Sequence, residues 1–277
     1  MSCKGTFFKV KFRASRLQKD VKNELNFVSS SELNRLKSCM CTVTLFPLKN
    51  SGFVLTSNRD EAPNRKALKP DIYSNEETLL WYPKDPDGNG SWIGVSSKNR
   101  AVCLLNGAHE KHKRQLPYRQ SRGMVVTHLL KCELIQYELM EYNLNNIEPF
   151  TLVVADWNHS MQWFELVWDG KKRHVRELPL GTYVWSSATL YDEHMRKERK
   201  QWFQEFVDSE ELTPETISQF HRTAGKTNVD YGVIMDRGFV KTTSITQIVK
   251  EDIAVRLHFE DLQTQSQYSD TLELPLV

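Results

Sequence analysis

Short β-prone segments joined in pairs by turn residues are the feature that most constrains the fold of this chain. Each segment is rich in Val, Ile, Thr, Leu or Phe and is bounded by Gly, Asn, Asp or Ser. Such pairs are typical of β-hairpins. The predicted hairpins join residues 41–46 to 53–58 through Lys49-Asn-Ser-Gly52, residues 92–95 to 101–105 through 97–100, and residues 150–156 to 161–167.

The remaining predicted elements place the helices in blocks. Further strands are predicted at 173–178, 183–185, 239–249, 253–259 and 271–275. Helices are predicted at 121–142 with Ser121 as the N-cap, at 192–207 and at 213–223. The Pro-, Asp- and Gly-rich segment after Asn58, through about Gly90, is predicted to be a loop. Because hairpins dominate, the pattern favours antiparallel sheets with helices outside them.

Residues 1–39 differ in charge from the rest of the chain. They carry nine Lys and Arg against three Asp and Glu, a net charge of +6, whereas the whole chain carries +2. Their apolar residues follow no period of 2 or 3.6. We therefore expect residues 1–40 to be an extension outside the fold and residues 41–277 to form one domain. The extension could be a mis-called start upstream of Met40, a propeptide, a basic targeting arm or a tail without a role; we favour the first.

The composition argues against several classes of protein. A net charge of +2 gives no global sign of nucleic-acid binding. No apolar run approaches the ~18 residues that span a bilayer, and no signal-peptide pattern is visible. Five cysteines without framework spacing argue against a secreted disulfide scaffold, so a reducing, cytoplasmic setting is expected.

No metal and no cofactor is predicted, and the expected partner is a small-molecule substrate or ligand. Residues 85–90 resemble the start of a calcium loop, but the twelfth position is Ser96 and the flanks are strand-like. The basic run from His109 to Arg114 is expected to be a solvated loop. It follows Asn106, so at a pocket mouth it would attract an anionic substrate. The sequence does not indicate an oligomeric state.

The first predicted hairpin brings Cys41 close to a charged segment. If the turn is centred on residues 50–51, Cys41 lies opposite Asp60. Directly opposed Cβ atoms lie ~4.5–5.5 Å apart. A bulge would shift the partner to Arg59 or Glu61. In each of these registers Cys41 faces the same polar strand end.

A cysteine in this place has a chemical use if it is the first residue of the mature chain. Removal of Met40 leaves Cys41 with an α-amine of pKa ~7.7–8.0 beside a thiol of pKa ~8.5. The amine can take the thiol proton near neutral pH, so one residue supplies both nucleophile and base. Arg59 would favour the thiolate, and Asp60 would hold the ammonium form. The alternative is a structural cysteine buried beside a surface ion pair.

Four motifs resemble, in order and spacing, the NRDE family, which includes the transport and Golgi organisation proteins of eukaryotes and many bacterial members. They are Met40-Cys-Thr-Val-Thr44, Thr56-Ser-Asn-Arg-Asp-Glu61, Gly90-Ser-Trp-Ile-Gly94 and Leu105-Asn-Gly107. Members usually start at the methionine before the cysteine, which points to Met40. The family looks like a branch of the N-terminal nucleophile (Ntn) hydrolases. The resemblance therefore implies an α+β fold, a four-layer αββα sandwich of two antiparallel sheets.

The resemblance also implies roles for individual residues. Cys41 would be the nucleophile and base. Arg59 and Asp60 would set its charge state, and Asn106 would donate a hydrogen bond to the oxyanion or the substrate. The residues expected to contact the substrate are Asn58, Glu61, Trp92 and Ser187. In related hydrolases an Asn commonly stands where this chain has Ser187, whose hydroxyl is a weaker donor.

Two functions from different classes follow from the resemblance. The chain is similar to the cholylglycine hydrolase and penicillin V acylase group, which cleaves non-peptide amide bonds. The expected enzyme attacks such an amide of a small substrate with Cys41 and passes through an acyl-thioester. The alternative is a non-catalytic protein on the same scaffold that binds or transports acyl-CoA, lipid or haem. A degenerate enzyme is expected if residues 1–40 stay attached.

Overall fold

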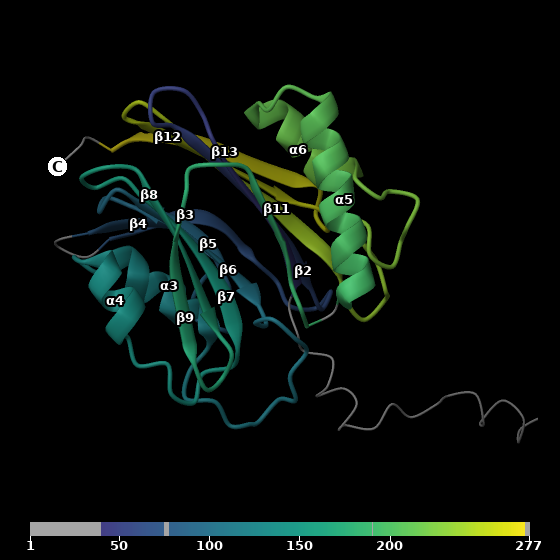
Figure 1. Cartoon of the computed structure of the whole chain (residues 1–277), viewed down its shortest axis with the longest axis horizontal. Helices are drawn as coiled ribbons and strands as arrows, with labels where there is room; N and C mark the ends of the chain where they lie inside the picture. The colour runs from purple at the N-terminus through teal and green to yellow at the C-terminus, as the bar shows by residue number, and fades with distance from the viewer. Residues whose placement is uncertain (1–39, 75–77, 190, 275–277) are drawn as a thin grey trace, which may run out of the picture. The chain divides into compact units, whose positions relative to one another are not determined.

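Two antiparallel β-sheets face each other (Figure 1). The computed structural model describes residues 40–74, 78–189 and 191–274, which all belong to one compact unit. The first sheet has the strand order β10 (Tyr183–Ser186), β1 (Met40–Pro47), β2 (Phe53–Glu61), β11 (Lys241–Glu251), β12 (Ala254–Asp261) and β13 (Ser266–Glu273). The second has the order β3 (Leu68–Ser74), β4 (Leu79–Lys84), β5 (Ile93–Ser96), β6 (Arg100–Asn106), β7 (Phe150–Asp156), β8 (Gln162–Trp168) and β9 (Arg173–Leu178).

Helices cover the outer face of each sheet, which completes the four layers α, β, β and α (Figure 1). Helices α5 (Glu193–Ser209) and α6 (Pro214–Thr223) pack on the first sheet, where Phe203 and Phe220 belong to the same buried cluster as Val54 of β2. Helices α3 (Arg122–Lys131) and α4 (Ile135–Glu141) pack on the second sheet. The predicted α+β sandwich of two antiparallel sheets is confirmed.

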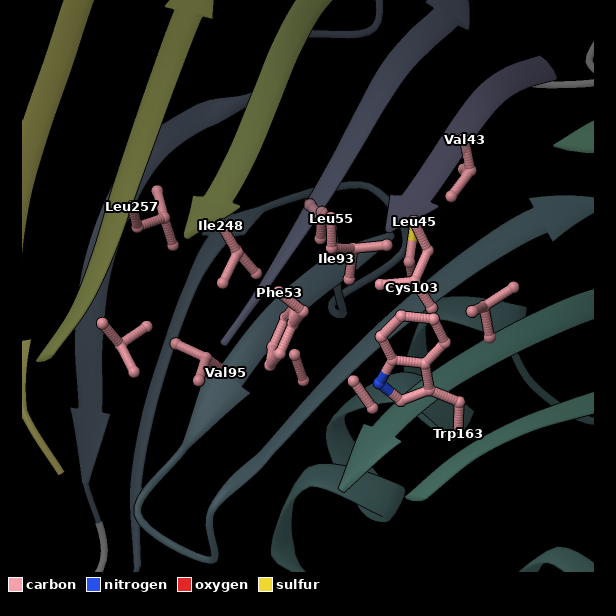
Figure 2. Close-up of a cluster of buried hydrophobic side chains, with 14 of the residues drawn as sticks. Val43, Leu45, Phe53, Leu55, Ile93, Val95, Cys103, Trp163, Ile248 and Leu257 are labelled. Atoms are coloured by element: carbon pink, nitrogen blue, oxygen red, sulfur yellow. The ribbon is translucent and has the colours of Figure 1, made fainter. Parts of the chain in front are cut away.

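The main core lies between the two sheets (Figure 2). Successive residues of a strand point to opposite faces, so β1 directs Val43 and Leu45 into this core and Phe46 toward the helices. Because both faces of the central strands are covered, these strands are apolar almost throughout, and each fully buried Leu or Phe contributes about 1.5–3 kcal/mol. The core residues labelled in Figure 2 are Val43, Leu45, Phe53, Leu55, Ile93, Val95, Cys103, Trp163, Ile248 and Leu257.

The first hairpin forms as predicted, with a register that a bulge shifts by one residue. Asn50 and Ser51 both have positive φ, 54° and 55°, and Gly52 N donates to the Lys49 carbonyl. The Gly52 carbonyl then accepts from Leu48 N, so Gly52 is opposed by two residues, Leu48 and Lys49, which follow the end of β1. The pairing that follows begins at Pro47 and Phe53 and places Cys41 opposite Arg59 rather than Asp60.

The start of β1 differs slightly from the predicted domain boundary at residue 41. The strand begins at Met40, which pairs with Asp60. Residues 1–39, which carry the rest of the predicted extension, lie outside the described residues. None of the described helices is both long and apolar enough to cross a bilayer.

The predicted helix at 121–142 is two helices, and Arg100 explains the break. Ser121 caps α3 as predicted, accepting a hydrogen bond from Gly123 N. At the other end Nη1 of the buried Arg100 donates to the carbonyls of Leu129 and Cys132, at 2.8 and 2.7 Å. These carbonyls are satisfied by Arg100, and the helix ends there.

The loop predicted between Asn58 and Gly90 is wrong in part, because it contains β3 and β4. Proline normally interrupts a ladder, and both strands contain one, Pro70 and Pro83. β3 is the edge strand of its sheet and is mostly exposed, which is where proline is tolerated. Tertiary packing therefore overrides the local sequence signal here.

Two glycines allow α3 to approach the second sheet closely. Gly90 precedes β5 and Gly123 lies in the first turn of α3, and the Gly123 carbonyl accepts from Ser91 N at 3.4 Å. A Cβ added at Gly90 would lie 2.5 Å from the Gly123 carbonyl oxygen. A rigid helix backbone cannot move out of the way, so this position requires glycine.

We predict that Gly90→Ala lowers the free energy of unfolding by about 2–3 kcal/mol, because the methyl group overlaps backbone atoms of α3. Urea unfolding followed by tryptophan fluorescence measures the change. Gly181→Ala is the matched control, since its nearest neighbours would be side-chain atoms of Tyr183 at 3.6 Å or more. Equal stability of the two variants would contradict the close approach.

Candidate active site

The predicted catalytic residues meet at the N-terminal end of β1. The Cα of Cys41 pairs with that of Arg59 on β2, and Thr42 pairs with Ser186 on β10. Ser187 directly follows the last residue of β10, so it lies at the same strand end as position 41. Position 41 thus has Arg59 as its partner on β2 and the end of β10 on its other side.

The side chain of Arg59 is buried between the sheets, with 1% exposure. Its guanidinium carbon lies 4.7 Å from the centroid of the Trp92 ring, a cation–π contact. Its Nη1 donates to the Arg65 carbonyl at 3.1 Å and to Thr243 Oγ1 at 3.3 Å. Trp92, predicted to contact the substrate, thus forms one wall of the Arg59 environment.

The second amino group of Arg59 is less satisfied than the first. Its Nη2 lies 3.9 Å from the Glu61 carboxylate and 4.0 Å from that of Asp85, and it makes no hydrogen bond to any described residue. Both carboxylates are bonded more closely by Arg65, at 3.1 and 2.6 Å. Glu61, another predicted substrate contact, is therefore held by Arg65, and Arg59 keeps a buried N–H that can bind an anion.

Asp60 points to the opposite face of β2, toward the helices. Its Oδ1 accepts from Thr242 Oγ1 at 2.6 Å and its Oδ2 from the Tyr191 hydroxyl at 3.0 Å. Burial raises the pKa of Asp60 to about 6, although the positive charge of Arg199 and the two hydrogen bonds lower it. Burial likewise raises the pKa of Tyr191 above its usual range, so this phenol stays protonated and remains a donor.

Asn58 also faces the helices, and its polar atoms are all engaged. Its Nδ2 donates to the carbonyls of His221 and Val233, at 2.9 and 2.7 Å, and its Oδ1 lies 2.6 Å from His221 Nδ1. Burial lowers the pKa of His221 to about 3, so the ring is neutral and its Nε2 accepts from Thr44 Oγ1 at 2.8 Å. Asn58, predicted to contact the substrate, instead holds α6 to β1 and β2.

A hydrogen bond from Ser187 joins the two sheets beside position 41. The Ser187 hydroxyl donates to the Asn106 carbonyl at the end of β6 and lies 3.0 Å from Thr189 Oγ1. Gly107 follows with φ +84°, and a Cβ there would lie 2.6 Å from Thr189 Cγ2. The Leu-Asn-Gly motif thus combines a left-handed turn with a close approach that only glycine permits.

A pocket of about 420 Å³ opens next to this junction. Its size is within the range of small-molecule sites. Ser186 and Ser187 form the part of the wall nearest position 41 in the strand register. The lining residues are Leu105, Ala108, His109, Thr151, Glu165, Val167, His174, Val175, Arg176, Trp185, Ser186, Ser187 and Arg196.

Arg199 of α5 is a central residue of the site that the sequence reasoning missed. It is 1% exposed, and its guanidinium stacks on the Tyr191 ring at 4.0 Å. It donates to Thr42 Oγ1 on β1 and to Ser186 Oγ on β10, the latter at 3.2 Å, so it ties β1, the strand of position 41, to its neighbour β10. The sequence does contain a sign of this role: Arg199 is a charged residue on the apolar stripe of the helix, which also contains Phe203 and Phe206.

The eight predicted site residues thus divide between two faces and one junction. Arg59, Glu61 and Trp92 lie between the sheets, whereas Asn58 and Asp60 face the helices. Asn106 and Ser187 are joined by a hydrogen bond beside Cys41, the eighth predicted residue. Within the described part of the chain, no group of three or more His, Cys, Asp or Glu side chains is placed to hold a metal.

Comparisons with known proteins identify a family and a fold. The family model described as Transport and Golgi organisation 2 matches residues 39–263. Among solved structures, an N-acylethanolamine-hydrolyzing acid amidase ortholog from Caenorhabditis elegans has a TM-score of 0.52 at 11% identity, covering 75% of this chain and 92% of its own. Penicillin V acylase from Agrobacterium tumefaciens has the same TM-score and identity, covering 83% and 85%. No curated protein matches the sequence. The structural likeness establishes the Ntn-hydrolase fold.

We predict that Asp60 makes the free energy of unfolding fall as the pH rises, and that Asp60→Asn removes this dependence. The carboxyl titrates near pH 3.8 when unfolded and near 6 when folded, so the folded state binds the proton more tightly. Its stabilising contribution is present below about pH 3.8 and is lost as the pH rises through about 6. Between about pH 3.5 and 7 the unmodified chain should lose up to about 3 kcal/mol relative to the variant. Urea unfolding at both pH values measures this, and parallel pH profiles would contradict it.

Proposed function

Because the chain belongs to the Transport and Golgi organisation 2 family, we propose that it is a cysteine-nucleophile amidohydrolase in which Cys41 becomes the N-terminal residue. The substrate would be a small molecule with a non-peptide amide. A reducing compartment keeps an unpaired thiol from oxidising, so the proposed location is the cytoplasm. The observation that carries the proposal is the strand register that pairs Cys41 with Arg59, beside a pocket of substrate size.

The register supports a catalytic role for a free α-amine at Cys41. Met40 pairs with Asp60, and Cys41 pairs with Arg59. If Met40 is removed, the new amine lies between the positions of these two partners on β2. The amine would act as the base that takes the thiol proton, and the carboxylate of Asp60 would favour the ammonium that forms.

Arg59 supports the thiolate form of Cys41. It is a permanent cation, buried at the register position opposite Cys41, and its Nη2 makes no hydrogen bond to the residues described. A cation in such a place lowers the pKa of a neighbouring thiol by stabilising its charged form. The thiolate would attack the carbonyl carbon of the amide and form a tetrahedral intermediate.

The α-amine of Cys41 would also serve the two later steps, departure of the leaving amine and hydrolysis of the thioester. The ammonium of Cys41 would give its proton to the leaving amine, which departs and leaves an acyl-thioester on Cys41. Water, with its proton taken by the same amine, would then hydrolyse the thioester and release the acid. Asn106 is the proposed oxyanion donor. The Ser187 hydroxyl already donates to the Asn106 carbonyl, so Ser187 would position Asn106 rather than bind the oxyanion itself.

We predict that a chain starting at Cys41 forms an acyl adduct with N-acyl p-nitroanilides and releases p-nitroaniline. Intact-mass spectrometry detects the adduct, and absorbance follows the release. Cys41→Ala should abolish both, and Cys132→Ser, the matched control, should abolish neither. Cys103 and Cys132 are poor competitors, because burial raises the pKa of their thiols to about 12 and about 11.

Two outcomes of this experiment would contradict the hydrolase proposal. The first is an adduct of equal yield on a chain that retains residues 1–40, because its α-amine is then blocked. The second is tight ligand binding without any adduct and without dependence on Cys41. That result would favour the alternative, a carrier of acyl-CoA, lipid or haem, which the ligand-sized pocket would also serve.

We also predict that Arg59→Gln raises the pH at which Cys41 becomes reactive by about one unit or more, because a nearby cation shifts a pKa by about that amount. The rate of alkylation by iodoacetamide, measured against pH on a chain starting at Cys41, gives the midpoint. Arg65→Gln is the control, since Arg65 contacts Glu61 and Asp85 on the same network. A midpoint unchanged in Arg59→Gln would remove Arg59 from the mechanism.

A further inference from the structure

The pocket beside position 41 has an apolar wall. Leu105 and Val167 come from strands of the second sheet and Trp185 from β10 of the first. The Trp185 ring stacks on Tyr183, with ring centroids 5.4 Å apart, so its position is fixed. A wall of this kind takes the apolar part of a ligand.

Among the described residues, Glu165 is the one carboxylate that lines the pocket, and it is already paired. Arg176 Nε and Nη2 donate to Glu165 at 2.6 and 3.0 Å, and Trp185 Nε1 donates at 2.7 Å. Burial would raise the pKa of Glu165, but these hydrogen bonds and the charge of Arg176 lower it overall. Glu165 therefore stays ionised and paired, and it offers no free negative charge to a ligand.

Besides the Glu165–Arg176 pair, the described lining of the pocket carries one more permanent charge, that of Arg196 on α5. His174 Nε2 lies 3.0 Å from Asp169 Oδ2, outside the pocket. Among the described residues, no carboxylate lies within ion-pair distance of Arg196. Its Nη1 donates to the His109 carbonyl at 3.0 Å and its Nε lies 3.4 Å from the Asp192 carbonyl. The guanidinium is thus held at the pocket by neutral acceptors and keeps its full charge.

His109 lies next to Arg196 in the pocket lining, since its carbonyl accepts from Arg196 Nη1. The His109 ring is 5.5 Å from the His174 ring in an edge-on arrangement, and both line the pocket with Arg196. A lining that combines the guanidinium of Arg196 with the apolar Leu105, Val167 and Trp185 fits a ligand with both characters.

We propose that this pocket binds a small amide whose apolar part lies against Trp185 and whose anionic group, a carboxylate or a phosphate, pairs with Arg196. The inference deepens the proposed function by naming the substrate class, and it rests on that function only for the cleavage step. An Arg held by carbonyl groups retains N–H donors for such an anion, in a geometry that suits both acids. His109 would add a second donor.

Binding measurements on Cys41→Ala separate this inference from the hydrolase proposal, because they require no turnover. Isothermal titration would compare N-octanoyl glycine, N-octanoyl O-phosphoethanolamine and the neutral N-octanoyl ethanolamine. We expect at least one anionic amide to bind about tenfold tighter than the neutral one, and the carboxylate and phosphate ligands to show which acid is preferred. Adding Arg196→Gln should remove the preference without weakening the neutral ligand.

Two further variants test whether the charge of Arg196 and its place in the pocket cause the preference. Arg196→Lys retains the charge and should keep part of the preference. Arg119→Gln is the matched control, since Arg119 also donates only to carbonyls, those of Asn143 and Asn145, and does not line the pocket. Its affinities should equal those of Cys41→Ala alone.

The inference is overturned if none of the three amides binds, if the neutral amide binds as tightly as the anionic ones, or if Arg196→Gln weakens all three equally. Hydrolysis of amides without an anionic preference would keep the proposed function and reject this inference. If the preference depends on Arg196 but the protein never forms an acyl adduct, this inference is kept and the hydrolase proposal is rejected. The pocket would then belong to a carrier.

Discussion

The structure depends on the burial of one polar strand end on both of its faces. All nine residues of β2 are buried, but only the first three, Phe53 to Leu55, are apolar. The residues from Thr56 to Glu61 must therefore find polar partners in the layers above and below. On the face toward the helices, His221 of α6, Tyr191 and Thr242 of β11 bond to Asn58 and Asp60. On the face between the sheets, Arg65 bonds to Glu61, and Thr243 accepts from Arg59. An unpaired buried charge costs several kcal/mol, so these partners are required for folding as well as for chemistry.

This constraint explains which parts of the fold follow from the sequence. Turn residues and alternation are local, so the three hairpins are predicted correctly. The end of α3 is not local, because the residue that caps its carbonyls, Arg100, lies on β6. β3 and β4 are missed since proline is unfavourable in an isolated strand, yet β3 lies at an edge. The register of the first hairpin depends on a bulge at Gly52 that the turn residues alone do not specify.

In the candidate site, too, the features set by local sequence are predicted and those set by distant residues are not. The motif from Asn58 to Glu61 predicts that these residues lie near position 41, but not how they divide between the faces of β2. That division follows from the alternation of a strand covered on both sides. It directs Asn58 to His221 and α6, a structural task, and Arg59 to the interior between the sheets. Arg199 could be found only by noticing a charged residue on an apolar helical stripe, because its partners are far away in sequence.

The environment of Asp60 bears on why the proposed mature chain would begin at Cys41. Its carboxylate accepts hydrogen bonds from two hydroxyl groups, and Arg199, whose guanidinium stacks on the Tyr191 ring, is the cation that lowers its pKa most. Burial therefore dominates, and the pKa of Asp60 rises to about 6. A peptide bond at Met40 brings no charge to this place, whereas an α-ammonium on Cys41 would bring one. Such a cation would stabilise the ionised carboxylate, and the carboxylate would in turn favour the ammonium. The two groups would then be coupled, so the proton that the thiol gives up would remain beside the reacting bond until the leaving amine takes it.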